Sequence, residues 1–77
     1  MIKVYTKDNC MQCTFTKRKL DEMGLEYKEL DALKASDELW EKYGVMSVPF
    51  VKVTEDNHWT GFRPDRIEEI ANEVNNQ

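Results

Sequence analysis

The two cysteines of this sequence, Cys10 and Cys13, are separated only by Met11 and Gln12. Thiols at this spacing, at a turn between a strand and a helix, can form and break a disulfide, which is the chemistry of thiol–disulfide exchange. The pair would be a poor structural crosslink, because a disulfide across so short a loop hardly constrains the unfolded chain. The spacing therefore predicts reactive thiols.

The position of each cysteine in the expected helix predicts its role. Cys10 is expected at the helix N-terminus, where backbone N–H groups and the helix dipole favour a thiolate, the species that attacks a disulfide. Lys7, three residues earlier, is a candidate for an additional stabilising cation. Cys13 falls one turn deeper, and we expect it to be the resolving thiol. It would attack the mixed disulfide formed by Cys10 and leave a Cys10–Cys13 disulfide.

These residues also permit uses other than redox chemistry. A structural zinc site needs four ligands, and besides the cysteines this chain offers only His58. Two copies of the chain could supply four cysteines, so a metal-binding or dimerising module stays as an alternative from another class. His58 itself is expected to be a solvated turn residue. The basic run at residues 17–19 is expected to be a solvated helix face, with steering of an acidic partner as the less favoured interpretation.

The composition excludes several classes of function. The net charge is −4, and charged residues of both signs make up 34% of the chain, which argues against nucleic-acid binding. No apolar stretch is long enough to span a membrane, and the first residues are too soon polar for a signal peptide. The 77 residues are expected to form one domain, covering residues 1–77. Two thiols without a wider disulfide framework favour a reducing, cytoplasmic compartment.

The elements that must position the cysteines follow from hydrophobic spacing and from turn residues. Cys13, Thr16, Leu20 and Met23 share one helix face, and Gly24 is suited to end that helix. Strands are predicted over residues 2–5, 25–30, 49–53 and 58–60.

Two further helices complete the order βαβαββα. The second runs over residues 36–43, with Ser36 as its cap, Gly44 as its end, and Trp40 and Tyr43 in the core. The last begins at Pro64 and has an apolar stripe formed by Ile67, Ile70, Ala71 and Val74.

This order resembles the thioredoxin fold in its glutaredoxin-like form. The resemblance implies an α/β domain with a four-stranded mixed sheet and three helices. It also implies a cis peptide bond between Val48 and Pro49, with both residues beside the sulfurs. In that position the Val48 backbone would pair with an incoming peptide in the manner of a β-strand.

A second segment, Trp59-Thr60-Gly61-Phe62-Arg63-Pro64-Asp65, narrows the resemblance. Together with Cys10-Met11-Gln12-Cys13 it resembles the NrdH-redoxin family, with Thr60 in place of the usual serine. The resemblance implies an electron donor to the large subunit of class Ib ribonucleotide reductase that is recharged by thioredoxin reductase. It implies no cofactor and no metal, and nothing in the chain demands more than a monomer. The residues expected to bind or border the partner are Met11, Gln12, Val48, Pro49, Thr60, Gly61, Phe62 and Arg63.

Glutaredoxins that use glutathione usually have a Gly-Gly pair before the last helix. Here Phe62, Arg63 and Pro64 occupy that stretch, and we expect their side chains to fill or close the cleft. Pro64 also removes a backbone donor, so glutathione binding is expected to be weak. Arg63 is expected either to pair with Asp65 or to hold the loop shut. A glutathione-dependent glutaredoxin is the alternative within the same class.

Overall fold

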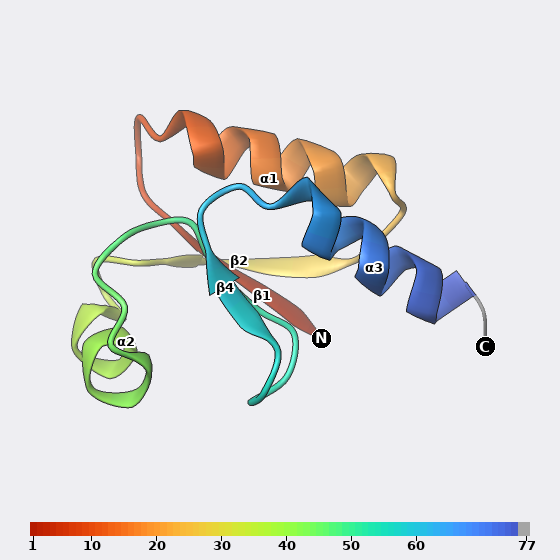
Figure 1. Ribbon diagram of the computed structural model, residues 1–77. Helices are drawn as coiled ribbons and strands as arrows, with labels where there is room; N and C mark the ends of the chain where they lie inside the picture. The colour runs from red at the N-terminus through yellow and green to blue at the C-terminus, as the bar shows by residue number, and fades with distance from the viewer. Residues whose placement is uncertain (76–77) are drawn as a thin grey trace.

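In the computed structural model, which describes residues 1–75, strands and helices follow the predicted order βαβαββα (Figure 1). The bounds agree with the expected ones to within about two residues. The elements are β1 (Ile2–Thr6), α1 (Met11–Glu22), β2 (Tyr27–Asp31), α2 (Ser36–Tyr43), β3 (Phe50–Lys52), β4 (His58–Thr60) and α3 (Pro64–Asn75).

The four strands form one mixed sheet in the order β2-β1-β3-β4. β1 and β2 are parallel, as expected for strands joined by a helical crossover, whereas β3 pairs antiparallel with both β1 and β4. The predicted four-stranded mixed sheet is confirmed. The central strand β1 leads directly to the turn that carries Cys10, so the reactive segment stands at the end of a strand paired on both sides.

Helices cover both faces of the sheet, with α1 and α3 on one face and α2 on the other (Figure 1). Successive strand residues point to opposite faces, so Val4 and Val51 pack under α1 and α3, while Tyr5 and Phe50 pack toward α2. The larger core cluster consists of Ile2, Val4, Leu20, Leu25, Val51, Trp59, Ile67, Ile70 and Ala71.

Glycines end two of the helices as predicted. Gly24 follows α1 with φ +70°, and Gly44 closes α2 with φ +66°, a region that side chains with a Cβ rarely occupy. The predicted cap of α2 is wrong, because Ala35 takes the cap position and Ser36 is the first helical residue, without a side-chain capping bond. The preceding turn, in which the Ala35 N–H donates to the Asp31 carbonyl, runs straight into the helix.

Two residues expected in the core are exposed. Trp40 is 57% exposed, because α2 is short and buries Leu39, and the neighbouring position points about 100° away around the helix. Val74 is 55% exposed because the last turn of α3 extends beyond the strands (Figure 1). Tyr43 does pack against the cluster beneath α2, so only part of that expectation is confirmed.

Candidate active site

Cys10 and Cys13 lie at the start of α1 in different environments. Cys10 has an extended backbone and caps the helix, with its side chain half-buried. Cys13 is only 2% exposed. The Cys13 N–H donates to the Cys10 Sγ at 3.2 Å, a hydrogen bond that favours negative charge on the outer sulfur. The geometry thus presents one accessible thiol with a helix N-terminus behind it and one sheltered thiol.

The sheltered thiol holds its proton tightly. Burial, followed by a hydrogen bond with Cys10, raises the pKa of Cys13 to about 11. The nearby Lys7 backbone amide acts in the opposite direction and lowers the pKa of Cys13. Cys13 is therefore a thiol at neutral pH.

Lys7 lies where sequence placed it, in the turn before Cys10, and its side chain is exposed. It lines the cavities on both sides of the Cys10 position. Its backbone amide, which the sequence did not indicate as important, lowers the pKa of Cys13. Stabilisation of the Cys10 thiolate by the Lys7 ammonium stays a prediction.

A groove of about 830 Å³ opens beside Cys10, and most of the expected partner-binding residues line it. Met11, 72% exposed, stands at its rim. Val48 lines the groove, and Pro49 is buried behind it, joined by the predicted cis peptide bond. The Pro49 carbonyl accepts the Gly61 N–H at 2.8 Å, which ties the end of β4 to this wall. The groove residues from the predicted set are Met11, Gln12, Val48, Thr60 and Gly61.

Phe62 and Arg63 do not line this groove, so the expectation that their side chains fill or close it is wrong. The Phe62 ring instead packs against Phe15 of α1, with centroids 5.9 Å apart, since a second aromatic ring is available there. The Arg63 guanidinium forms two hydrogen bonds to the Asp65 carboxylate, at 3.2 and 3.0 Å, which confirms one of the two roles considered for it.

A hydrogen bond joins the Cys10–Cys13 segment to the segment of residues 59–65. The Phe62 N–H donates to Gln12 Oε1 at 3.3 Å. The side chain between the two cysteines therefore occupies a backbone donor just before α3. Neither segment alone indicates this contact, because the two residues are 50 positions apart.

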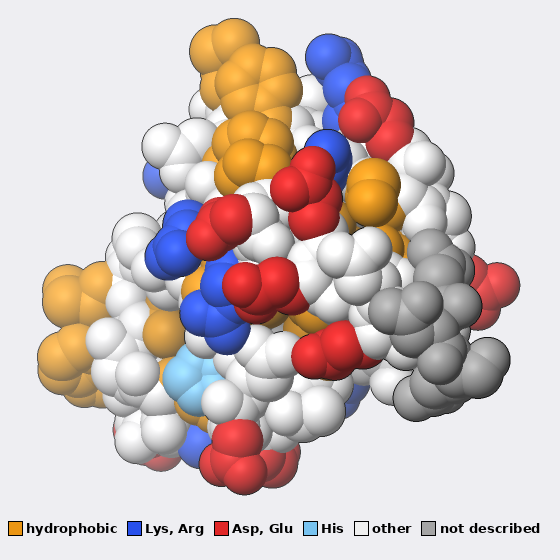
Figure 2. Space-filling view, turned by 45° about the vertical axis from the view of Figure 1, so that its right-hand side comes forward, with side chains coloured by type: hydrophobic (Ala, Val, Ile, Leu, Met, Phe, Trp, Pro, Cys, Tyr) orange, Lys and Arg blue, Asp and Glu red, His pale blue; other side chains and the backbone are white. Residues whose placement is uncertain are grey.

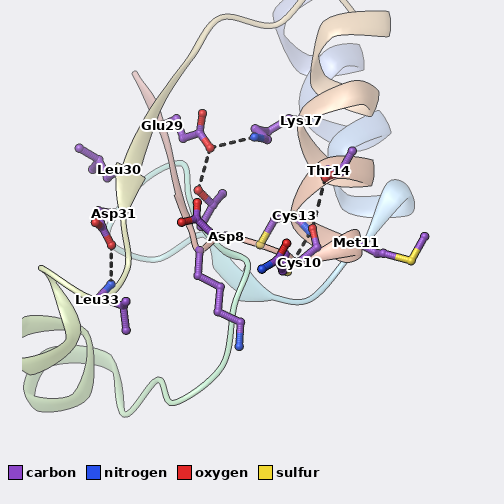
Figure 3. Close-up of a pocket in the computed structure, with 13 residues that line it drawn as sticks. Asp8, Cys10, Met11, Cys13, Thr14, Lys17, Glu29, Leu30, Asp31 and Leu33 are labelled. Carbon is purple, nitrogen blue, oxygen red and sulfur yellow. Dashed lines mark hydrogen bonds and ion pairs between the residues drawn. The ribbon is translucent and has the colours of Figure 1, made fainter.

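A second cavity, of about 860 Å³, lies on the other side of Cys10, between α1 and β2 (Figure 3). On its wall the Lys17 ammonium and the buried Thr6 hydroxyl both donate to Glu29 Oε2, at 2.9 and 2.7 Å. These bonds lower the pKa of Glu29. Sequence reasoning missed this cluster; its one available signal was the position of Lys17, four residues after Cys13 on the same helix face.

The basic run and His58 differ from their expected roles. Lys17 pairs with Glu29 and Lys19 with Glu68, so two of the three basic residues form ion pairs. His58 is a half-buried residue of β4 whose ring packs edge-on against Tyr43 at 4.9 Å, and it is not a solvated turn residue. Within residues 1–75 no three histidine, cysteine or acidic side chains gather as a metal site.

On the face drawn in Figure 2, neither basic nor acidic side chains form a large continuous patch. Lysine and arginine side chains alternate there with acidic ones, between hydrophobic groups at the upper and left edges. No helix among residues 1–75 is long and apolar enough to cross a membrane.

Comparisons with known proteins agree with the geometry of the site. The glutaredoxin family model matches residues 2–59. The glutaredoxin-like protein NrdH of Salmonella typhimurium is 34% identical over 71 residues, covering 90% of this chain and 86% of that protein. NrdH of Lactococcus lactis subsp. cremoris is 32% identical over 74 residues, covering 92% and 100%. The solved structure of NrdH-redoxin from Escherichia coli superposes with a TM-score of 0.79 at 31% identity, covering 90% and 92%.

Proposed function

This chain belongs to the glutaredoxin family, within its NrdH-redoxin group, and we propose that it is the hydrogen donor to class Ib ribonucleotide reductase. It is a thiol–disulfide oxidoreductase that carries electrons on its own cysteines. In the proposed reaction Cys10 attacks the disulfide of the large reductase subunit, and Cys13 then releases the reduced partner. Thioredoxin reductase, in a reducing cytoplasm, restores the two thiols.

The main support for a donor independent of glutathione is the hydrogen bond between Gln12 Oε1 and the Phe62 N–H. Backbone N–H groups at a helix N-terminus bind anionic groups such as a carboxylate. Here the Phe62 N–H, two residues before α3, is occupied by Gln12 Oε1, and Pro64, the first residue of the helix, has no N–H to offer. An incoming carboxylate would have to displace an internal hydrogen bond.

Charge at the same helix end also disfavours glutathione. Asp65 lies in the first turn of α3, where its carboxylate takes the favourable position for a negative charge. The nearby Arg63 cation is already paired with Asp65 at 3.0 Å. We therefore expect weak glutathione binding because the Phe62 N–H is already hydrogen-bonded and the Asp65 carboxylate repels a second anion. This explanation replaces the filled cleft expected from the sequence. The thioredoxin-like activity profile named for NrdH-redoxin from Escherichia coli supports the same choice of reductase.

The identity of the reductant is tested by following NADPH consumption with a protein disulfide substrate. One reaction contains thioredoxin reductase, and the other contains glutathione with glutathione reductase. We expect turnover with thioredoxin reductase and little with glutathione. Efficient turnover with glutathione alone would overturn the proposal in favour of a glutathione-dependent glutaredoxin.

The acceptor is tested by trapping. A Cys13→Ser variant keeps the attacking thiol but loses the resolving one, so it should accumulate a mixed disulfide with the class Ib large subunit. The matched Cys10→Ser variant should trap nothing. If neither variant, or both equally, become crosslinked, the assigned roles of the two cysteines are wrong.

A further inference from the structure

The cavity between α1 and β2 is lined by both a cation and the sheltered thiol. Lys17 lies one helical turn after Cys13, and both side chains line the cavity, as Figure 3 shows. The Lys17 side chain is 31% exposed, and its ammonium is fixed by Glu29 Oε2 at 2.9 Å. Thr6 is only 7% exposed, and its hydroxyl donates to the same carboxylate oxygen at 2.7 Å. The cation is thereby held at the wall of the cavity.

We propose that Lys17 is an electrostatic positioning residue for the second half of the exchange, with its charge favouring the Cys13 thiolate and Glu29 both anchoring and partly offsetting that charge. The inference rests on the proposed division of roles between Cys10 and Cys13. The cluster formed by Thr6, Lys17 and Glu29 has no part in the proposed function described above, and this inference gives it a role in the reaction.

The chemical step shows why a cation is needed there. Cys13 gives its proton to solvent in the open cavity, and the thiolate attacks the Cys10 sulfur of the mixed disulfide. The Cys10–partner bond breaks as the Cys10–Cys13 bond forms, and the partner leaves as a thiolate with the bonding electron pair. Negative charge therefore appears on Cys13 before it passes to the partner, and a positive charge in the same cavity lowers the cost of that charge.

The other charged groups of the cavity are less suited than Lys17 to stabilise the Cys13 thiolate. Burial and then Cys10 raise the pKa of Cys13, and Lys17 acts in the opposite direction. Asp8, Asp31 and Lys7 also line the cavity, but Asp31 Oδ1 accepts the Leu33 N–H, and the influence of Lys7 on the pKa of Cys13 comes from its backbone amide. The Lys17 ammonium both lowers the pKa of Cys13 and is held in place by its ion pair with Glu29.

Dithiodipyridine separates the two half-reactions, and its lack of charge avoids a direct attraction to Lys17. The attack of Cys10 releases one thiopyridone at a rate that depends on reagent concentration. The attack of Cys13 releases the second at a rate that does not. We expect Lys17→Met to slow the second release about two- to threefold near neutral pH, since the loss of thiolate is partly offset by higher nucleophilicity. The midpoint of its pH profile should move to higher pH.

Matched variants separate this effect from a change in folding. Lys17→Arg should restore the profile, and Lys19→Met, which breaks the Glu68 ion pair on the same helix, should leave it unchanged. Glu29→Gln keeps a hydrogen-bond acceptor but removes the offsetting charge, so its midpoint should move to lower pH. If Lys17→Met does not fold, Lys17→Arg and Glu29→Gln still carry the test.

Two results would overturn the inference: second-release profiles of Lys17→Met and the unmodified protein that superimpose, or a Glu29→Gln midpoint that moves to higher pH. A protein that releases the first thiopyridone but never the second would refute the resolving role of Cys13 itself. That outcome counts against the proposed function and is distinct from a failure of Lys17 alone.

Discussion

The burial of Cys13 predicts a loss of stability in alkaline solution. The pKa of this thiol is about 11 in the folded protein, against an ordinary value of 9.0. At a pH between these two pKa values, Cys13 has lost its proton in the unfolded chain but keeps it in the folded protein. The free energy of unfolding therefore falls as the pH rises through this window. For one such group the loss is about 1.3 kcal/mol between about pH 8 and about pH 10.

The assay is urea unfolding of the reduced protein at several pH values, compared with Cys13→Ala. Removal of the thiol costs some stability at every pH, so only the difference between the two pH dependences is informative. Burial also raises the pKa of Tyr5 and Tyr27, but both tyrosines are present in each protein and cancel from the difference. Parallel curves between about pH 8 and about pH 10 would refute the argument that burial holds the Cys13 proton. If Cys13→Ala does not fold, thiolate absorbance of reduced Cys10→Ser, in which Cys13 is the one remaining cysteine, shows directly whether Cys13 still titrates above its ordinary range.

Two further predictions concern stability, measured by urea unfolding. Gly61→Ala should cost about 1–2 kcal/mol, and more than Gly24→Ala, because both glycines have positive φ but only at Gly61 would a Cβ meet another side chain, Gln12 Oε1 at 3.4 Å. Equal costs would contradict the crowding argument. Leu39→Ala should cost about 2–4 kcal/mol, whereas Trp40→Ala should cost well under that, since Leu39 is buried and Trp40 is largely exposed. A larger loss at Trp40 would show that α2 packs by its other side.

The parts of the fold that sequence predicted are those with a local cause. Gly24 and Gly44 ended helices because a left-handed conformation suits glycine, and Pro64 opened α3 because its missing N–H costs nothing there. The different burial of Cys10 and Cys13 also followed from local spacing, since one turn of helix separates a half-buried position from a fully buried one. The cis bond before Pro49 came from family resemblance, because the X–Pro sequence alone favours the trans form.

The parts that sequence missed depend on contacts between distant elements. The Phe62 side chain was expected in the cleft, but its ring packs on Phe15, a residue of α1 that is 47 positions away in the sequence. Glu29 lies on β2, where polar and apolar residues do not alternate cleanly, so nothing local showed that it reaches Lys17 on α1. A charged side chain on a strand is usually solvated. Only the parallel pairing of β1 and β2 brings Thr6 and Glu29 close enough to share a hydrogen bond.

The environment of Cys13 changes during the proposed reaction in a way that favours its own attack. Of the influences that raise the pKa of Cys13, burial is the largest and persists in the mixed disulfide. A mixed disulfide at Cys10 carries no charge, so the repulsion that a Cys10 thiolate exerts on a Cys13 thiolate disappears when the partner is bound. The Lys7 amide and the Lys17 ammonium remain and continue to lower the pKa of Cys13. The resolving thiol is therefore held protonated in the resting protein and becomes more acidic once there is a mixed disulfide to attack.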